Sequence, residues 1–385
     1  MRIALNHTRF CPAGGAENYV LRLAEHLLAR GDEVHCVGRK PPCPSDARLR
    51  FHRVRCIPFP QELRILSFAY GSARRVAAGA FDLAIGLGRT FGHDVHRDSS
   101  GAFESFREAL APRFARSRLY CRVARHIERR LYEDPRLIHT FTVSGFVKRQ
   151  IQECYGIPDA RISVLRNGVA QPAPRGGARE TERALVRRRA GTNGDRLVAV
   201  FVGNDWRRKG LDRAIEGLRR TRAPWDLWVV GDDKHGRPLR RSVPADARSR
   251  VRFLGPQDGM SHLAAADALL FPSRFDSLAN VVLEAMACGL PVIVSPMDGA
   301  AEIVGGGGGG FVLENPADAA EIAAKLDALS DAPARAALER RAIDAVAPLT
   351  WERHFTQLDD LLARAAREKA ERRGTRSPAG KLEPV

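Results

Sequence analysis

The sequence of 385 residues lacks several features that mark particular classes of protein. No apolar run approaches the roughly 18 residues that a membrane span requires, so no transmembrane segment is expected. The seven cysteines are scattered and form no C-x-x-C pair, which argues against a disulfide framework and against a zinc site. The apolar run at residues 3–5 is too short for a signal-peptide core. These absences together favour a cytoplasmic protein.

Aromatic residues are also few, at 7%, whereas acidic residues are outnumbered, with 45 Asp and Glu against 62 Lys and Arg. The resulting net charge of +17 predicts attraction to nucleic acid, acidic lipid or a phosphorylated substrate. Nucleic acid is the least favoured of these partners, because the arginines are not interleaved with stacking aromatics. The hydrophobic share of 44% and the charged share of 28% are ordinary for a globular protein.

The first half of the chain has the pattern of a parallel α/β domain. Residues 3–5 and 34–37 are predicted strands, and residues 16–30 carry apolar side chains at helical spacing. This β-turn-α-β order requires a right-handed crossover, and residues 81–87 and 141–144 are predicted to add further strands. We therefore predict a Rossmann-like domain over residues 1–170.

The second half repeats this alternation after a Pro-, Gly- and Arg-rich segment at 170–187, which is predicted to be a linker. Strands and helices then alternate from residue 197 to residue 295, so that a second doubly wound domain is predicted over residues 171–351. The six glycines at 305–310 are predicted to form a surface turn without chemistry. Helices are expected at 316–329, 333–345 and 351–371, and residues 372–385 are expected to form a basic tail.

The segment 271–291, F-P-S-R-F-D-S-L-A-N-V-V-L-E-A-M-A-C-G-L-P, joins a strand, a loop, a helix and a strand. Glu284 lies among apolar residues, where an unpaired charge is costly, so it should face a cleft and hold a polar partner. Ser277 is the expected helix cap, which leaves the amides of Leu278, Ala279 and Asn280 for a pyrophosphate. The alternative is an ordinary capped helix with an incidental glutamate.

Asp276 lies eight residues before Glu284, and D-x7-E followed by A-M-A-C-G-L-P-V-I resembles the E-x7-E donor-site signature of retaining glycosyltransferases of family 4. Members of that family have the GT-B fold. The resemblance implies that Glu284 bonds the ribose hydroxyls of a nucleotide and that Asp276 approaches the hydroxyls of the transferred sugar. Asp276 is one methylene shorter than the family's glutamate, which affects the choice of sugar.

The segment V-G-N-D-W-R-R-K-G at 202–210 is similar to the family's V-G-R-x-x-x-x-K-G. The similarity implies that Lys209 is the phosphate-binding lysine, whose charge stabilises the departing diphosphate without a metal ion. Asn204 stands where the family has arginine, so Arg208 is expected to supply the second positive charge. The alternative is a solvated basic turn before a helix.

Gly14 and Gly15 stand between the first strand and the first helix, where the backbone can approach a phosphate or sugar without a Cβ clash. The run G-G-A-E matches the family's N-terminal loop, and the absence of G-x-G-x-x-G counts against a dinucleotide oxidoreductase. An ordinary tight turn is the alternative.

The run G-H-D-V-H-R-D-S-S-G at 92–101 holds four groups that could bind a metal, but no further ligand follows at zinc spacing, so no metal is expected. The run resembles the D-V-Y-R-x-G-x-G loop of the family's lipopolysaccharide core glucosyltransferases. That resemblance implies a contact to the transferred sugar from Asp98 first and His93 second, so both are candidate catalytic residues together with Lys209 and Asp276.

Residues 112–131 carry seven arginines and a single acid, with Leu119, Val123, Ile127 and Leu131 at i, i+4 spacing. This pattern predicts a basic amphipathic helix that faces an anionic membrane surface or a phosphorylated acceptor. The alternative is a surface helix whose apolar stripe packs on the first domain.

The motifs run in the family's order from Gly14 to Trp351, which implies two Rossmann-like domains facing a cleft and a C-terminal helix that crosses back to the first domain. The implied activity is retaining, metal-independent transfer of a hexose from a nucleotide diphosphate sugar of the UDP-glucose type. The implied acceptor is lipopolysaccharide core or a similar glycolipid at the inner membrane, with no cofactor. A nucleotide-sugar epimerase and a basic nucleic-acid-binding protein are the alternatives.

Overall fold

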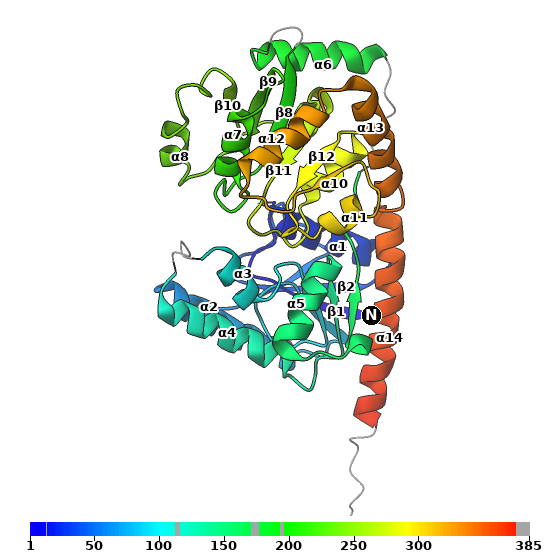
Figure 1. The fold of residues 1–385 in the computed structure, drawn as a ribbon. Helices are drawn as coiled ribbons and strands as arrows, with labels where there is room; N and C mark the ends of the chain where they lie inside the picture. Colours follow the sequence, from blue (N-terminus) through cyan, green and yellow to red (C-terminus); the bar gives the residue numbers. More distant parts are fainter. Residues whose placement is uncertain (13, 112–115, 171–176, 193–195, 375–385) are drawn as a thin grey trace, which may run out of the picture.

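The computed structural model describes residues 1–12, 14–111, 116–170, 177–192 and 196–374, which form two α/β domains (Figure 1). In the first domain the described strands form a seven-stranded, all-parallel sheet. Its order is β3 (Arg50–Arg53), β2 (Glu33–Gly38), β1 (Arg2–Asn6), β4 (Leu83–Gly86), β5 (Val95–Asp98), β6 (His139–Thr142) and β7 (Ile162–Val164).

Helices cover both faces of this sheet. Their apolar residues recur every three to four positions, so each helix has one apolar side that packs against the strands. In α1, for example, Val20, Leu23 and Leu27 are buried against the strand core. The helices are α1 (Gly15–Ala29), α2 (Gln61–Ala77), α3 (Phe103–Ala109), α4 (Arg118–Tyr132) and α5 (Gly145–Tyr155), with one 3-10 turn at Asp159–Arg161.

The second domain has a six-stranded parallel sheet in the order β10 (Val251–Gly255), β9 (Trp225–Val230), β8 (Leu197–Val202), β11 (Ala268–Phe271), β12 (Val292–Val294) and β13 (Gly310–Val312). Its helices are α6 (Gly177–Arg189), α7 (Leu211–Arg219), α8 (Arg237–Arg241), α9 (Gly259–Ala265), α10 (Asn280–Ala287), α11 (Ala301–Gly305), α12 (Ala319–Ala328) and α13 (Ala332–Val346).

Each sheet reverses its strand order at its first strand. The strand β1 lies between β2 and β4, and β8 lies between β9 and β11. Crevices at such switch points, outside the carboxyl ends of the strands, are where open α/β sheets bind ligands. The two reversal points therefore mark where a site between the domains should lie.

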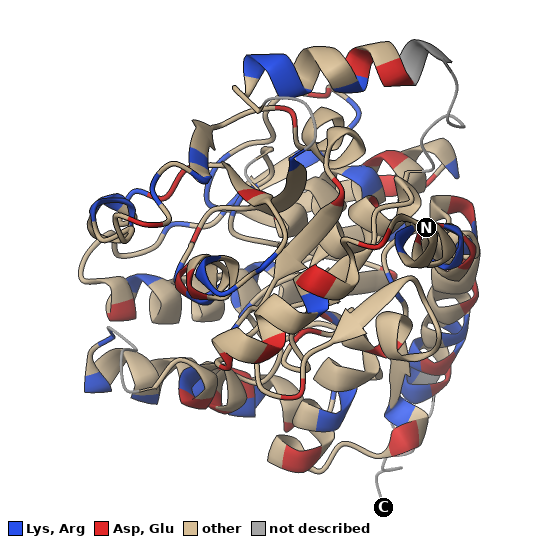
Figure 2. Cartoon of the chain, turned by 45° about the horizontal axis from the view of Figure 1, so that its top comes forward, with Lys and Arg blue, Asp and Glu red and all other residues tan. Residues whose placement is uncertain are grey.

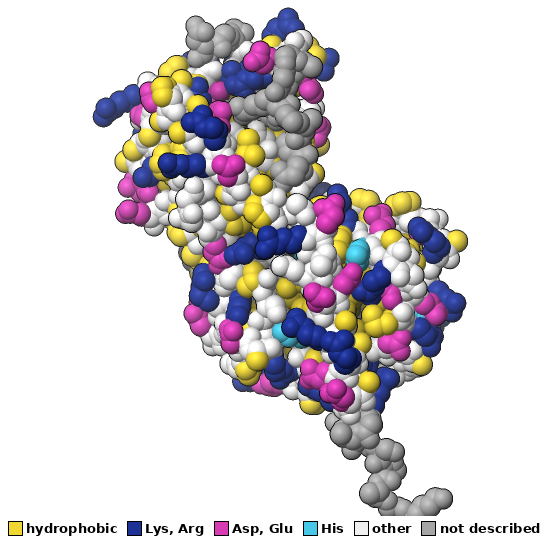
Figure 3. All heavy atoms as spheres, turned by 90° about the vertical axis from the view of Figure 1, so that its right-hand side faces the viewer, with side chains coloured by type: hydrophobic (Ala, Val, Ile, Leu, Met, Phe, Trp, Pro, Cys, Tyr) yellow, Lys and Arg dark blue, Asp and Glu magenta, His cyan; other side chains and the backbone are white. Residues whose placement is uncertain are grey.

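The last helix, α14 (Trp351–Gly374), returns from the second domain and runs along the first (Figure 1). Its Leu358, Leu361 and Leu362 are buried in the core formed by β1, β2, β4 and α1. Near its end, Lys369 Nζ lies 2.6 Å from Asp94 Oδ2. Basic and acidic side chains are mixed on the face of the molecule that α14 borders (Figure 3). The predicted two-domain fold with a returning C-terminal helix is confirmed.

The predicted linker at 170–187 is wrong in part, because α6 begins at Gly177. Two of the arginines that gave the segment its linker composition bind a buried acid instead. Arg183 Nη2 and Arg187 Nη2 donate to the two carboxylate oxygens of Asp267, at 2.6 and 2.5 Å. Residues 171–176 of the linker and 375–385 of the predicted basic tail lie outside the described residues.

The glycine run also differs from the surface turn that was predicted. Its first three residues are exposed, but Gly308 and Gly309 are buried, and Gly310 begins β13. A Cβ on Gly309, whose φ is +42°, would collide with the backbone of Ala342 in α13. The second half of the run is therefore glycine because a helix packs directly against it.

Charged residues are spread over both domains, and Lys and Arg positions lie among Asp and Glu positions along the chain (Figure 2). Among the described residues, no helix is long and apolar enough to cross a membrane.

Candidate functional site

The N-termini of α1 and α10 face each other where the two domains meet. A Cβ on Gly15 would lie 3.1 Å from Asn280 Nδ2, so the glycine allows this close approach. Asn280 Oδ1 in turn accepts a hydrogen bond of 2.8 Å from Asn167 Nδ2, and Asn167 Oδ1 accepts one of 2.9 Å from Arg97 Nη2. The predicted Gly14-Gly15 loop and the predicted Asn280 thus lie on opposite walls of one interdomain site.

Glu284 lies on α10 with buried apolar residues on both sides of it in the sequence. Burial raises the pKa of its carboxyl group, and the Lys209 ammonium opposes that rise. Among the described residues, no donor makes a hydrogen bond to its carboxylate. The predicted polar partner is therefore Lys209 acting through charge, and both carboxylate oxygens remain able to accept bonds from a ligand.

Lys209 lies in the loop before α7, where its side chain is half-buried. Burial lowers the pKa of its ammonium group, while Asp276 acts in the opposite direction. Its Nζ lies 5.1 Å from the centre of the Phe271 ring and against Gly203, where a Cβ would occupy the space that the ammonium fills. Gly203 therefore leaves the space that the Lys209 ammonium occupies, and the V-G-x5-K-G spacing has a steric reason.

Arg208 does not present a free charge, although it was predicted to supply one. Its Nη1 donates to Asp276 Oδ2 at 2.9 Å and to the Phe275 carbonyl oxygen at 2.9 Å, and its Nε donates to Asp205 Oδ2 at 2.9 Å. Burial would lower the pKa of Arg208, but the two carboxylates outweigh it and raise that pKa. Asp276 is thereby held beside the site as half of an ion pair.

Asp298 is a site residue that the sequence did not reveal. It is 1% exposed, and its Oδ1 accepts hydrogen bonds from the amides of Ala279 at 3.2 Å and Ala300 at 2.9 Å. Burial, with Asp276 nearby, raises the pKa of Asp298 to about 8. The sequence feature that could have identified Asp298 is its position shortly after β12. The carboxyl ends of neighbouring parallel strands meet at one edge of a sheet, so a residue after β12 can lie close to the residues after β11.

The predicted cap of α10 is therefore wrong. Asp298, not Ser277, bonds the Ala279 amide, because Ser277 Oγ donates 2.6 Å across the domain boundary to the Ser99 carbonyl oxygen. Of the three predicted anion-binding amides, that of Ala279 is thus occupied. No bond within the described residues occupies the amides of Leu278 and Asn280.

The structure corrects the predicted placement of His93. This residue is 1% exposed, fits under Gly86 and stacks on His96 with ring centres 5.2 Å apart. Burial lowers the pKa of its imidazole well below the usual value. A side chain enclosed inside the first domain does not reach a sugar in the cleft.

Asp98 lies nearer the domain boundary but its carboxylate is fully engaged. Oδ1 accepts from the amides of Ser100 and Gly101, both at 2.8 Å, and Oδ2 accepts from the Tyr132 hydroxyl at 2.6 Å. Asp98 is 5% exposed. It therefore shapes the loop at 98–101, whose Ser99 carbonyl bonds Ser277, and the predicted direct sugar contact is not made by a free carboxylate.

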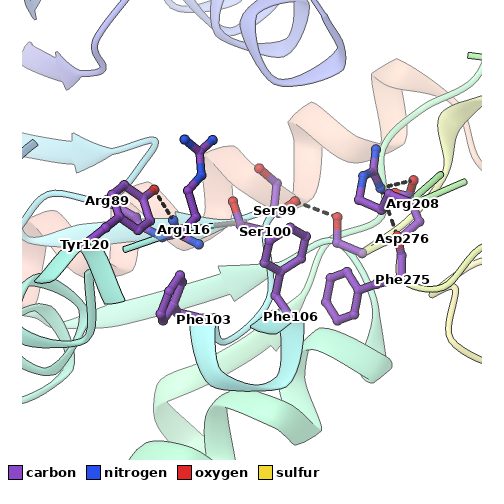
Figure 4. Close-up of a pocket in the computed structure, with 11 residues that line it drawn as sticks. Arg89, Ser99, Ser100, Phe103, Phe106, Arg116, Tyr120, Arg208, Phe275 and Asp276 are labelled. Atoms are coloured by element: carbon purple, nitrogen blue, oxygen red, sulfur yellow. Dashed lines mark hydrogen bonds and ion pairs between the residues drawn. The ribbon is translucent and has the colours of Figure 1, made fainter. Parts of the chain in front are cut away.

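A pocket of about 470 Å³ lies between residues of the first domain, at 89, 99–106, 116 and 120, and residues of the second domain, at 208 and 275–277. Figure 4 shows Arg89, Tyr120 and Arg116 at one end and the Arg208–Asp276 pair at the other. The pocket is lined by Arg89, Ser99, Ser100, Phe103, Phe106, Arg116, Tyr120, Arg208, Phe275, Asp276 and Ser277.

The predicted basic helix at 112–131 is α4 from residue 118 onward, and residues 112–115 lie outside the described residues. The predicted apolar stripe was one residue out of register at its start, because Leu119 is 54% exposed and Tyr120 is buried. Buried residues of α4 pack against α2 and α3. Beside them, a surface pocket of about 540 Å³ is lined by Arg107, Ala111, Arg116, Arg118, Cys121, Arg122 and Arg125.

One buried acid on α4 departs from this basic pattern. Glu128 accepts hydrogen bonds from the Phe103 amide at 2.9 Å and the Tyr155 hydroxyl at 2.5 Å. Burial raises the pKa of Glu128 to about 7. Across the residues that the structure describes, His, Cys, Asp and Glu side chains form no group of three or more that could hold a metal ion.

Comparison with known proteins agrees with this geometry. The sequence model of Glycosyltransferase Family 4 matches residues 13–170, and that of Glycosyl transferases group 1 matches residues 196–332. Lipopolysaccharide glucosyltransferase WaaG of Escherichia coli strain K12 is 25% identical over 374 residues, which cover 94% of this chain and 96% of WaaG.

Solved structures give the same result for the fold. A crystal structure of WaaG, a glycosyltransferase involved in lipopolysaccharide biosynthesis, superposes with a TM-score of 0.79 and 23% identity over 94% of this chain and 99% of that one. HepE from Anabaena, in complex with UDP and glucose, superposes with a TM-score of 0.71 and 18% identity over 94% and 99% of the two chains.

Proposed function

Because the chain belongs to the family 4 glycosyltransferases and has the GT-B fold, we propose that it transfers a hexose, with retention of configuration, from a nucleotide diphosphate sugar to a glycolipid acceptor. The observation that carries the donor assignment is the pair Glu284 and Lys209 at the switch point of the second sheet. The Glu284 carboxylate has no hydrogen-bond donor among the described residues and can accept from hydroxyls, and the half-buried Lys209 ammonium can bind phosphate.

Each group has a defined task in this proposal. Glu284 accepts hydrogen bonds from the two ribose hydroxyls, and the amides of Leu278 and Asn280 bind the diphosphate at the N-terminus of α10. Lys209 stabilises the negative charge that grows on the diphosphate as the glycosidic bond breaks. With this cation in place, the departure of the leaving group needs no metal ion, and we propose a metal-independent reaction.

The state of the nearby acids favours front-side attack assisted by the leaving phosphate. A covalent intermediate on the enzyme would need a free carboxylate at the sugar carbon. Asp276 is paired with Arg208, and Asp98 is bound by two amides and a tyrosine hydroxyl. Asp276 instead holds a hydroxyl of the transferred sugar through the carboxylate oxygen that Arg208 leaves available.

The acceptor is lipopolysaccharide core or a similar glycolipid, by analogy with WaaG. An acceptor of this kind lies at an anionic membrane surface, and the exposed arginines of α4 fit such a surface. Exposed apolar residues lie beside them: Ile57, Phe59 and Leu63 flank the start of α2, which Arg116 bonds through Gln61. Binding to acidic vesicles should fall with salt and be lost when three arginines become Glu, at Arg118, Arg122 and Arg125.

The donor assignment is tested by a turnover screen across UDP-, GDP- and ADP-sugars in the presence of EDTA. We expect one nucleotide class to be hydrolysed slowly without acceptor, with unchanged rate in EDTA and with the α-anomer of the sugar released from an α-linked donor. Release of the opposite anomer would contradict retention. Isomerisation of the donor without transfer would identify an epimerase instead.

A further inference from the structure

Two arginines of the interdomain pocket, Arg89 and Arg116, form no ion pair with a carboxylate in the part of the chain that the structure describes. Arg89 Nη1 lies 3.5 Å from the Tyr120 hydroxyl, its Cζ lies 4.9 Å from the centre of the Phe103 ring, and its Nε is buried without a hydrogen-bond partner. Arg116 donates to the neutral Gln61 Oε1 at 2.7 Å and lies 5.2 Å over the Tyr120 ring. Among the described residues, neither guanidinium has a carboxylate within ion-pair distance.

Two acids that these arginines influence through charge bind other groups. Glu128, which Arg89 influences through charge, is buried and accepts from the Phe103 amide and the Tyr155 hydroxyl. Glu62, which Arg116 influences, accepts from the Ser117 hydroxyl. A buried guanidinium nitrogen without a partner is costly, so this end of the pocket suits an anion that the described residues do not provide.

The opposite end of the pocket differs in charge. There Arg208 is paired with Asp276 and Asp205, so it offers no free charge. The pocket therefore has a polarity, with a cationic end on the first domain and a neutral end beside the proposed position of the transferred sugar (Figure 4).

Aromatic rings lie between the two ends. Phe106 of α3 meets Phe275 of the second domain edge to face, with ring centres 5.4 Å apart, and Phe103 lies beneath Arg89. Apolar ring faces of this kind pack against the C–H faces of a saccharide, and guanidinium groups bind phosphate or carboxylate oxygens in bidentate fashion. The combination fits a sugar that carries an acidic substituent.

We propose that the acceptor is an acidic saccharide, whose phosphate or carboxylate is bound by Arg89 and Arg116 while its acceptor hydroxyl lies toward Asp276. This inference rests on the proposed function for the direction of the sugar, but the binding of the anion does not depend on it. Arg116 also lines the surface pocket on α4 with Arg118 and Arg122, so the anionic part of a longer acceptor continues from the cleft onto that helix.

The test uses UDP-saturated protein and three soluble probes, which are glucose, glucose 6-phosphate and glucuronic acid. We expect the parent to bind at least one acidic probe roughly 10-fold or more tightly than glucose, since a charge-assisted hydrogen bond is about twice as strong as a neutral one. The preference should disappear in Arg89→Gln and in Arg116→Gln. It should remain in the control Arg129→Gln, which removes the same charge from an exposed residue of α4 that is paired with Glu133.

Equal binding of all three probes by the parent would overturn the proposal, and so would a preference that survives both substitutions. Loss of UDP affinity in Arg89→Gln and Arg116→Gln, with the sugar preference intact, would assign the arginines to the donor instead. If Arg89→Gln does not fold, the test relies on Arg116→Gln, whose side chain is exposed, and on Arg89→Lys, which keeps the charge. Loss of the preference in Arg116→Gln would then support the proposal, and a preference that survives in it would overturn the proposal. Failure of donor hydrolysis would contradict the proposed function, but the probe preference would still test this pocket.

Discussion

The substitution Glu284→Gln separates a nucleotide-binding role from a structural one. The amide has nearly the same shape as the carboxylate, so the packing of α10 is preserved. It also removes a charge whose burial raises its pKa, which means that the folded protein accommodates the carboxylate at a cost. Without ligand, the variant should therefore melt at the same temperature as the parent or slightly above it.

The expected loss is in donor affinity. A hydrogen bond to a charged group contributes about 1.5 to 3 kcal/mol and a neutral one about 0.5 to 1.5 kcal/mol, so each ribose bond should weaken by about 1 kcal/mol. Two such bonds give about 2 kcal/mol, which corresponds to an affinity roughly 30-fold lower. The ribose bonds need the ionised carboxylate, and burial raises the pKa of Glu284. As the pH is lowered, the donor affinity of the parent should therefore begin to fall at a higher pH than it would for an exposed glutamate. The Glu284→Gln variant should lack this pH dependence.

Titration calorimetry with UDP and with UMP measures this directly, because both carry the ribose hydroxyls. The control is Glu153→Gln, which removes one negative charge from the exposed side of α5, outside the cleft. A Glu284→Gln protein that binds UDP as the parent does would refute the ribose assignment. A large drop in melting temperature would show that the carboxylate is structural.

Lys209→Ala should lower kcat by about 100-fold or more and change donor affinity much less, because charge grows on the diphosphate only as the bond breaks; unchanged kcat in steady-state kinetics would contradict this. Burial lowers the pKa of the His96 and His354 imidazoles to about 4 in the folded protein. In the unfolded chain a histidine binds a proton below about pH 6.5, so the contribution of each residue to the free energy of unfolding is complete above that pH and is lost as the pH falls. Urea titrations should show a loss of roughly 2 kcal/mol for each histidine by pH 5. Gly309→Ala should cost about 1 to 3 kcal/mol through collision with Ala342, while Gly306→Ala, with φ −73° and no contact under 3.5 Å, should be neutral; equal melting temperatures would refute the packing argument.

The fold could be predicted from the sequence because its information is local and repeated. Alternating apolar strands and amphipathic helices define parallel sheets, and crossover handedness then leaves few topologies. Glu284 could be expected at a cleft because a charge among apolar residues needs a polar partner. Lys209 was identified by the resemblance of its segment to the family's V-G-R-x-x-x-x-K-G motif. Both residues follow strands of the second sheet, Lys209 after β8 and Glu284 after β11.

The partners of the site residues could not be predicted, because they come from distant segments. Arg208 is 68 residues from Asp276, and nothing near either residue shows that they neutralise each other. The predicted cap of α10 was wrong for a similar reason. Asp298 bonds the start of α10 from the loop after the next strand, whereas Ser277 bonds the other domain. The prediction that His93 contacts the sugar was wrong because His93 and His96 lie in the interior of the first domain. A sequence pattern does not distinguish an interior position from a position in a cleft.

The bonds across the domain boundary explain why several residues near the site are not free for substrate. Ser99 and Ser277, Ser144 and the Ser277 carbonyl, and Gly145 and Glu302 are joined between the domains at 2.6, 2.6 and 3.0 Å. These three bonds join the two domains near the neutral end of the pocket, where Ser99, Asp276 and Ser277 lie in its lining. At the other end the two uncompensated arginines lie on the first domain alone. In the proposed reaction, an acidic acceptor would therefore enter and leave from the cationic end without breaking these interdomain contacts.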